Sequence, residues 1–155
     1  MVDFTKLAEF KLEDIEKPKP LPLGTYEAVV EGTPKWGEAK FRDKETGEAP
    51  PMVTVVYRLV NPTDDVDQED LAAMGGLIGK NGKPRTISQD FIFNGGAPPY
   101  SLRRFIEGFG IEGGTLAEAL EGIVGEPVLV TVKHRLDEKT QDRYAQVDRA
   151  VANNR

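Results

Sequence analysis

The sequence predicts a mainly β protein, built as a five-stranded Greek-key barrel with a helical segment between the third and fourth strands. Stretches with the alternation or the β-branched content of strands occur three times in residues 24–93 and twice in residues 127–151. Residues 100–123, which lie between these two groups, show the three-to-four-residue apolar spacing of helices instead. The chain of 155 residues has the length of one ordinary domain.

Residues 1–21 are predicted to form an extended or flexible arm before a barrel domain of residues 22–152. Isolated apolar residues alternate with charged ones in this arm, and Pro18, Pro20 and Pro22 favour an extended linker at its end. The apolar spacing also permits a short amphipathic helix. The sequence leaves open whether the arm remains free or docks on a partner.

Three strands are expected before the helical segment. Alternating apolar and polar residues predict a first strand over residues 24–32, with residues 36–41 as a second limb of the same meander. The second strand, residues 52–60, is dense in β-branched residues. A turn at Asn81-Gly82 then leads into a third strand over residues 85–93.

One face of the 52–60 strand must belong to the core. Tyr57 shares a face with the apolar residues Val53 and Leu59. Arg58 shares the opposite face with Thr54. We therefore expect the face of Tyr57 to be the buried one.

Two helices and a hairpin complete the predicted fold. A helix over residues 100–109 is predicted by apolar residues on one helical face: Leu102, Phe105, Ile106 and Phe109. Thr115, followed three residues later by Glu118, forms a capping-box pattern at the start of a second short helix. Residues 127–134 and 143–151 are predicted to form a closing hairpin. This order of elements is that of the oligonucleotide-binding (OB) class of barrels.

The composition excludes several kinds of site. The chain has no cysteine and a single histidine, His134, so disulfides, thiolate sites and clustered-imidazole metal sites are excluded, and no cofactor is expected. His134 has no partner visible in the sequence, and we expect a protein that is not an enzyme. The carboxylates of residues 64–70 lack the glycine and the closing glutamate of a calcium loop, with Asp70 and Gly76 at those positions, which predicts a solvated acidic loop.

The charge and hydropathy patterns limit the kinds of partner that the protein can have. A net charge of -6 disfavours indiscriminate attraction to nucleic acid or to an anionic membrane, although it leaves room for a local basic groove. No apolar run has the length that spans a bilayer, and the N-terminus lacks the apolar region of a secretory signal. We therefore expect no membrane partner and a cytoplasmic location, with a virion as the alternative.

The expected binding groove combines aromatic rings for base stacking with cations for the phosphate backbone. The candidates fall in the first hairpin, the 52–60 strand, a glycine-rich loop and the closing hairpin: Lys35, Trp36, Lys40, Phe41, Arg42, Tyr57, Arg58, Lys80, Lys83, Arg85, Lys133, Arg135 and Arg143. Each set has an ordinary alternative. Trp36 can belong to the core or to an interface, the glycine-rich loop lacks the P-loop spacing, and the closing hairpin can simply be solvated. Arg103 and Arg104 are assigned to the solvated face of their helix.

A resemblance to a known family points the same way. The pattern Leu-Pro-x-Gly-x-Tyr in residues 21–29 resembles the opening strand of small phage and prophage single-stranded-DNA-binding proteins. Residues 102–110 and 120–125 are similar to that family's helix and to the entry to its fourth strand. The resemblance implies an OB fold and the coating of transient single-stranded DNA in phage replication or recombination, within the host cell. Residues 149–155 depart from the acidic tail with which many such proteins recruit partners.

Two functional hypotheses follow. The first is sequence-tolerant binding of single-stranded DNA in the barrel groove. The second is a phage structural or interaction protein, such as a virion component, which binds replication or virion proteins or further copies of itself through the N-terminal arm. Affinity for an oligonucleotide separates the two hypotheses.

Overall fold

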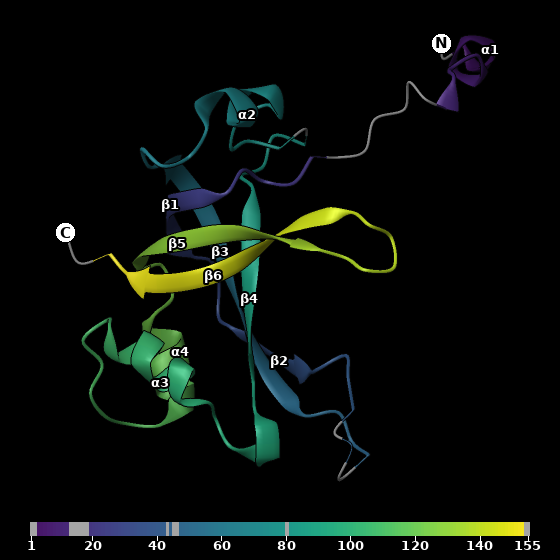
Figure 1. The fold of residues 1–155 in the computed structure, drawn as a ribbon. Coiled ribbons are helices and arrows are strands. Elements are labelled where there is room, and N and C mark those ends of the chain that lie inside the picture. The colour runs from purple at the N-terminus through teal and green to yellow at the C-terminus, as the bar shows by residue number, and fades with distance from the viewer. Residues whose placement is uncertain (1–2, 13–18, 43, 45–46, 80, 154–155) are drawn as a thin grey trace.

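The computed structural model describes residues 3–12, 19–42, 44, 47–79 and 81–153. It is a mainly β structure, as predicted, with one antiparallel sheet and a few short helices (Figure 1). The strands are β1 (Gly24–Val30), β2 (Lys35–Glu38), β3 (Pro51–Pro62), β4 (Thr86–Ile92), β5 (Pro127–Leu136) and β6 (Arg143–Ala152). The helices are α1 (Phe4–Ala8), α2 (Gln68–Ala73), α3 (Tyr100–Glu107) and α4 (Leu116–Gly122), with a 3₁₀ turn, η2 (Asn94–Gly96), after β4.

The sheet has the order β2-β3-β1-β5-β6, and β4 pairs with the other edge of β3. Six strands replace the predicted five because the first one is interrupted between β1 and β2, where Gly32 takes a φ of 72° and Pro34 is buried. Both pieces pair with β3, β1 with its C-terminal half and β2 with its N-terminal half. Within the described residues β4 pairs only with β3 and β6 only with β5, so the sheet is open.

The core lies on the predicted face of β3. Val53, Val55 and Tyr57 are fully buried, whereas Arg58 on the opposite face is exposed. β1 and β5 add their own alternating apolar residues to this face: Tyr26, Ala28, Val30, Val128, Val130 and Val132. Strict alternation on three neighbouring strands therefore gives one continuous apolar surface.

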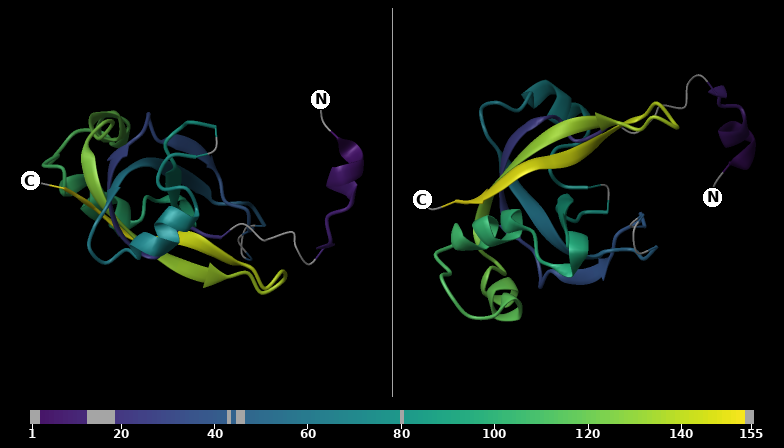
Figure 2. Two further views of the ribbon diagram at one scale, coloured as in Figure 1. Left: turned by 90° about the horizontal axis from the view of Figure 1, so that it is seen from above. Right: turned by 60° about the horizontal axis from the view of Figure 1, so that its bottom comes forward.

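The helices α3 and α4 cover one end of this surface (Figures 1 and 2). Both form where the sequence predicts them, and α3 buries Leu102, Phe105 and Ile106. The Thr115 side chain caps α4 by accepting a 3.2 Å hydrogen bond from the Glu118 N–H. Among the residues that the structure describes, no helix combines the length and the apolar character needed to cross a bilayer.

The helix α2 is absent from the sequence-based prediction, which describes residues 64–70 as a solvated loop. The Asp67 carboxylate caps this helix by accepting hydrogen bonds from the N–H groups of Glu69 and Asp70. Val66 and Leu71, which flank this N-terminus, are buried in the core. Two buried apolar side chains thus fix the structure of this stretch. Its five acidic residues are exposed, as predicted, but its C-terminal part is a helix and not a loop.

The helix α1 lies away from the sheet (Figures 1 and 2). No residue of α1 is buried. The chain joins the sheet at Leu21, whose carbonyl lies 2.7 Å from His134 Nε2, and at Pro22, whose carbonyl accepts a 2.6 Å hydrogen bond from the Tyr26 hydroxyl. The linker prediction falls partly on residues 13–18, which lie outside the described part of the chain.

Candidate nucleic-acid interface

Acidic residues are concentrated in two segments. Residues 64–70 hold five carboxylates and residues 107–126 hold five glutamates, and neither segment contains lysine or arginine. Because the whole chain carries -6, the remainder of the chain has a net charge of about +4. Figure 1 places the first segment at α2 and the second around α4, whereas the described ends of the loop after β2, residues 39–42 and 47–50, and the turn at residues 137–142 lie on the other side of the molecule. Both views of Figure 2 agree with this separation.

The β5–β6 hairpin carries cations and an aromatic ring on one face. Arg135 lies directly across from Tyr144, and Lys133, two residues before Arg135, faces the same way. The Tyr144 ring is 45% exposed. Lys133 Nζ makes a 3.1 Å ion pair with Asp148. Arg143, the last candidate of the hairpin, pairs with Leu136 and therefore lies on the opposite face.

The loop after β2 carries a second group of exposed candidates. Lys40, Phe41 and Arg42 follow one another in the chain and are all exposed, with Phe41 at 49%. The Arg42 side chain is partly fixed in position, because its Nη1 donates a 3.1 Å hydrogen bond to the carbonyl of Gly47. The loop thus presents one apolar ring between two cations.

Lys35 and Trp36 lie on opposite faces of β2, so they do not form one site. Trp36 pairs with Val53 on the core side, and its ring meets that of Phe93 edge-on at 5.5 Å. It is nevertheless 56% exposed, since β2 lies at the margin of the sheet. Lys35 pairs with Thr54 on the outer face of β3.

The outer face of β3 and β4 is polar. Arg58 is exposed there on the same face of β3 as Thr54, whose hydroxyl donates a 2.6 Å hydrogen bond to Asp90 on β4. This outer face therefore has a cation at each end, Lys35 and Arg58. Between them lie the neutral Thr54 and the acidic Asp90.

Tyr57 does not fit the predicted binding role. Its side chain is fully buried, and its hydroxyl donates a 2.7 Å hydrogen bond to the side-chain oxygen of Gln89. Burial also raises the pKa of the Tyr57 phenol far above its ordinary value. The ring is part of the core and offers no free face to a base.

Of the two candidates of the glycine-rich loop that the structure describes, one is exposed. Arg85 is half-buried, and its guanidinium donates hydrogen bonds of 2.9 and 2.7 Å to the carbonyls of Gly76 and Met74. Arg85 therefore fastens the loop to the end of α2 and is not among the exposed cations. Lys83 is exposed, and Lys80 lies outside the described residues.

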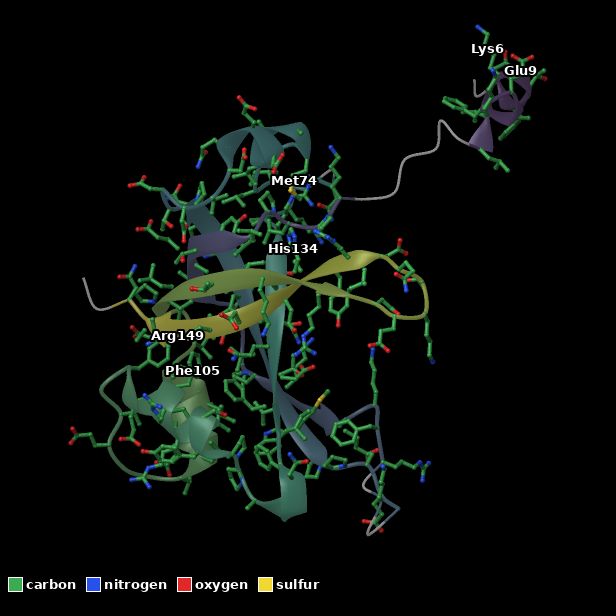
Figure 3. The ribbon with its side chains drawn as sticks, viewed as in Figure 1. Lys6, Glu9, Met74, Phe105, His134 and Arg149 are labelled. Carbon is green, nitrogen blue, oxygen red and sulfur yellow. The ribbon has the colours of Figure 1, made fainter. Side chains whose placement is uncertain are left out.

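Sequence reasoning missed Tyr144 and Arg149 and assigned Arg104 to a solvated helix face. Alternation along residues 143–151 could have placed Tyr144 beside Arg135, but a bulge opposite Thr131 and Val132 shifts the register before Arg149. Figure 3 shows Arg149 near the end of β6 that approaches Phe105 of α3. Among the described residues, no three acidic or histidine side chains form a set that could hold a metal ion.

Comparison of the chain with models of known protein families gives no match. A search of curated proteins likewise finds no relative that matches it. The functional argument therefore rests on the placement of the side chains themselves.

Proposed function

We propose that this protein binds single-stranded DNA on the side of the molecule where residues 39–42 and the end of the β5–β6 hairpin lie. The observation that carries the proposal is that exposed aromatic and cationic side chains occur in two places there. Lys40, Phe41 and Arg42 lie in the loop after β2, and Arg135 and Tyr144 lie on the strands of the β5–β6 hairpin, next to its turn (Figure 1). The two acidic segments, residues 64–70 and 107–126, lie elsewhere, whereas the hairpin loop itself carries Asp137, Glu138 and Asp142, which offset part of the positive charge at this place.

The strand pairing supports an OB-like barrel as the fold that presents these loops. With β1 and β2 taken as one interrupted strand, the pairings join the first strand to the second and fourth, the second to the third, and the fourth to the fifth. α3 and α4 lie between the third and fourth strands. OB barrels are partly open and bind oligonucleotides on strands two and three and on the loops after strands one and four. Those loops correspond to residues 39–50 and 137–142.

The chemistry of the exposed side chains favours a single strand over a duplex. Trp36, Phe41 and Tyr144 are each about half-exposed, and every ring that stacks on a base contributes about 1 to 3 kcal/mol. In a duplex the base faces are already stacked on one another, so only the phosphate contacts remain. The protein would coat transient single strands during phage replication or recombination in the host cytoplasm, the role that the family resemblance implies.

The test is a fluorescence-anisotropy titration of labelled dT30 at low and moderate salt, with a duplex of equal length as competitor. We expect saturable binding that weakens with salt and that the duplex does not displace. The double variants Arg135→Ala/Tyr144→Ala and Phe41→Ala/Arg42→Ala should each weaken binding by tenfold or more, because each removes about one stacked ring and one phosphate contact.

Arg103→Ala is the matched control. Arg103 is a well-exposed cation on α3 that pairs with Glu107 at 2.8 Å, remote from both loops. We expect its removal to leave the affinity unchanged. Absence of binding at low salt, or equal losses for the loop variants and the control, would show that these loops are not a DNA site.

The exposed apolar side chains of the arm favour a second candidate function, binding of a phage structural or replication protein. Phe4, Leu7, Phe10 and Leu12 are all more than half exposed. Deletion of residues 1–12 separates the two functions, because DNA binding by the loops should survive it, whereas partner binding or self-assembly through the arm should be lost. The deletion removes no residue of the core.

A further inference from the structure

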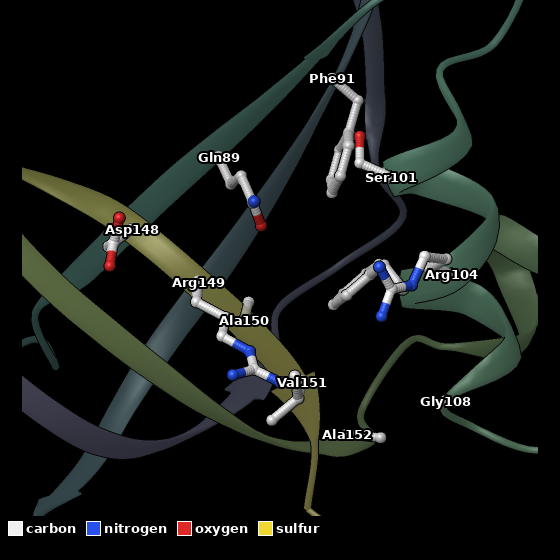
Figure 4. Close-up of a pocket in the computed structure, with 11 residues that line it drawn as sticks. Gln89, Phe91, Ser101, Arg104, Gly108, Asp148, Arg149, Ala150, Val151 and Ala152 are labelled. Carbon is white, nitrogen blue, oxygen red and sulfur yellow. The ribbon is translucent and has the colours of Figure 1, made fainter.

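A cleft of about 510 Å³ lies between β4, α3 and β6 (Figure 4). Gln89 and Phe91 line it from β4, Arg104 and Phe105 from α3, and the consecutive residues 148–152 from β6. The cleft is at the α3 end of the sheet, away from the loops to which DNA binding is assigned (Figures 1 and 3). It has no part in that function.

The wall formed by β6 is an open strand edge. β6 pairs only with β5 within the described residues, so its other edge, which faces the cleft, is not hydrogen-bonded to a strand, although β4 approaches it at the cleft. Five consecutive residues of β6, 148–152, line the cleft, which means that the backbone itself is accessible there and not only alternate side chains. Such an edge presents N–H and C=O groups to which an extended peptide can add as a further strand.

Two arginines from different elements reach into the cleft. Figure 4 shows Arg104 of α3 and Arg149 of β6 on either side of the space between the two elements. Both side chains are exposed, and within the described residues neither has a carboxylate partner. The carboxylate at the cleft, Asp148, pairs with Lys133 at 3.1 Å and so leaves the two guanidinium groups uncompensated.

The floor of the cleft is apolar and closed. Phe91 and Phe105 are 4% and 6% exposed, and their rings pack together at 5.6 Å. The side-chain oxygen of Gln89 is occupied by the Tyr57 hydroxyl, so its amide NH₂ is the donor that remains available. The cleft thus offers an apolar base, cations at the rim and one polar edge.

We propose that this cleft binds an extended acidic peptide segment of a partner protein, which adds to the open edge of β6 and places its carboxylates on Arg104 and Arg149. Alternating side chains of such a strand point in opposite directions, so acidic residues can reach the arginines while apolar residues face Phe91 and Phe105. Arginine binds a carboxylate through two parallel hydrogen bonds, which suits both guanidinium groups.

A peptide fits these features better than a nucleic acid does. The rings of Phe91 and Phe105, which form the floor of the cleft, are almost completely buried and expose no face on which a base could stack. Only two cations line the cleft, which is enough to neutralise about two phosphates of a phosphodiester chain. The inference is independent of DNA binding at the loops.

The experiment titrates the full chain into a fluorescein-labelled nonapeptide in which aspartate and glutamate alternate with valine and isoleucine. We expect saturable binding, and we expect the counterpart with asparagine and glutamine to bind at least tenfold more weakly. Arg104→Ala and Arg149→Ala should each cost about tenfold or more in affinity, as the loss of a charge-assisted contact does. Arg103→Ala, the neighbouring cation on α3, should leave the affinity unchanged.

Backbone pairing is tested on the peptide, so that no variant needs to fold. N-methylation at every second residue removes the N–H groups on one edge of an extended strand. Methylation on the edge that pairs with β6 should abolish binding, and methylation in the other phase should not. Equal effects of the two methylated peptides would overturn the strand-addition part of the proposal.

Two further results would overturn the proposal as a whole. One is no binding of the acidic peptide at protein concentrations up to about 1 mM, the weak end of specific association. The other is displacement of the peptide by dT30 together with loss of dT30 binding in the Arg104→Ala and Arg149→Ala variants, which would make the cleft a nucleic-acid site. Retention of dT30 binding in both variants, with loss of the peptide, supports two separate sites.

Discussion

Gly24 packs so closely against Val66 that any side chain at position 24 would collide with it. A Cβ at Gly24 would lie 2.7 Å from Val66 Cγ2 and 3.0 Å from the carbonyl oxygen of Asp65. Gly24 also has a φ of 132°, which L side chains rarely adopt. The start of β1 is thus fitted to the segment before α2, and both depend on the absence of a side chain.

Gly24→Ala should therefore destabilise the fold by roughly 2 kcal/mol or more, from backbone strain and overpacking together. Gly37→Ala is the control, because a Cβ there meets only Met52 Cε at 3.9 Å and the backbone φ is ordinary. Its effect should stay within about 0.5 kcal/mol. Urea unfolding followed by circular dichroism measures both variants. Equal midpoints for Gly24→Ala and the unsubstituted protein would contradict the contact.

Asp65 should make the free energy of unfolding depend on pH in the acid range. Its carboxylate accepts hydrogen bonds from the Thr25 N–H and from the hydroxyls of Thr63 and Thr25, which lower its pKa below the ordinary 3.8. The folded state then binds the proton less readily than the unfolded state does, so this stabilisation is present above pH 3.8 and is lost as the pH falls through the lowered pKa. Asp65→Asn should be less stable than the original protein at pH 7, with a smaller difference at pH 3. A difference independent of pH would argue against an ionised acceptor.

Tyr26 should make the free energy of unfolding depend on pH in the alkaline range. Burial, with a smaller contribution from the charge of Asp65, raises the pKa of the Tyr26 phenol from 10.0 to about 12. The neutral phenol is favoured in the folded state, so its contribution is complete below pH 10 and is lost as the pH rises through about 12. Tyr26→Phe should cost about 1 kcal/mol at pH 9 through the lost bond to Pro22 and should reduce the decline between pH 9 and pH 11. Urea unfolding at the two pH values measures both effects, and identical declines would refute the assignment.

Trp36 should report DNA binding directly, since it is the one tryptophan in the chain and is 56% exposed. We expect a solvent-like emission that acrylamide quenches, and saturable quenching by dT30 if a base stacks on the ring. A duplex of equal length should leave the emission unchanged. Unchanged emission at a dT30 concentration that saturates anisotropy would place the strand away from β2.

Local patterns were sufficient to predict much of this fold. Alternation identified the buried face of β3, and Thr115 with Glu118 marked the start of α4. What local patterns did not supply is the pairing of distant groups. The partners of Arg85 are carbonyls at the end of α2, a helix that two buried apolar residues fix in an acidic stretch.

The candidate site was harder to predict for the same reason. A residue type gives its chemistry but not its face, so Tyr57 was included although its ring is buried. Lys35 and Trp36 are neighbours in the chain, yet the pairing of β2 with β3 sends them to opposite faces. Arg149 was missed because a bulge in the β5–β6 ladder shifts the alternation just before it.

The pairing of β1 with β5 bears on how this chain folds during synthesis. Residues 24–29 pair with residues 127–132, so a ladder in the middle of the sheet joins two segments that are far apart in the sequence. The ribosome synthesises the first of them early and the second late. Until β5 emerges, one edge of β1 has no neighbour and the core lacks the buried valines of β5: Val128, Val130 and Val132. Folding should therefore be late and slow relative to a helical protein of this size, and the nascent chain should depend on chaperones that shield open strands.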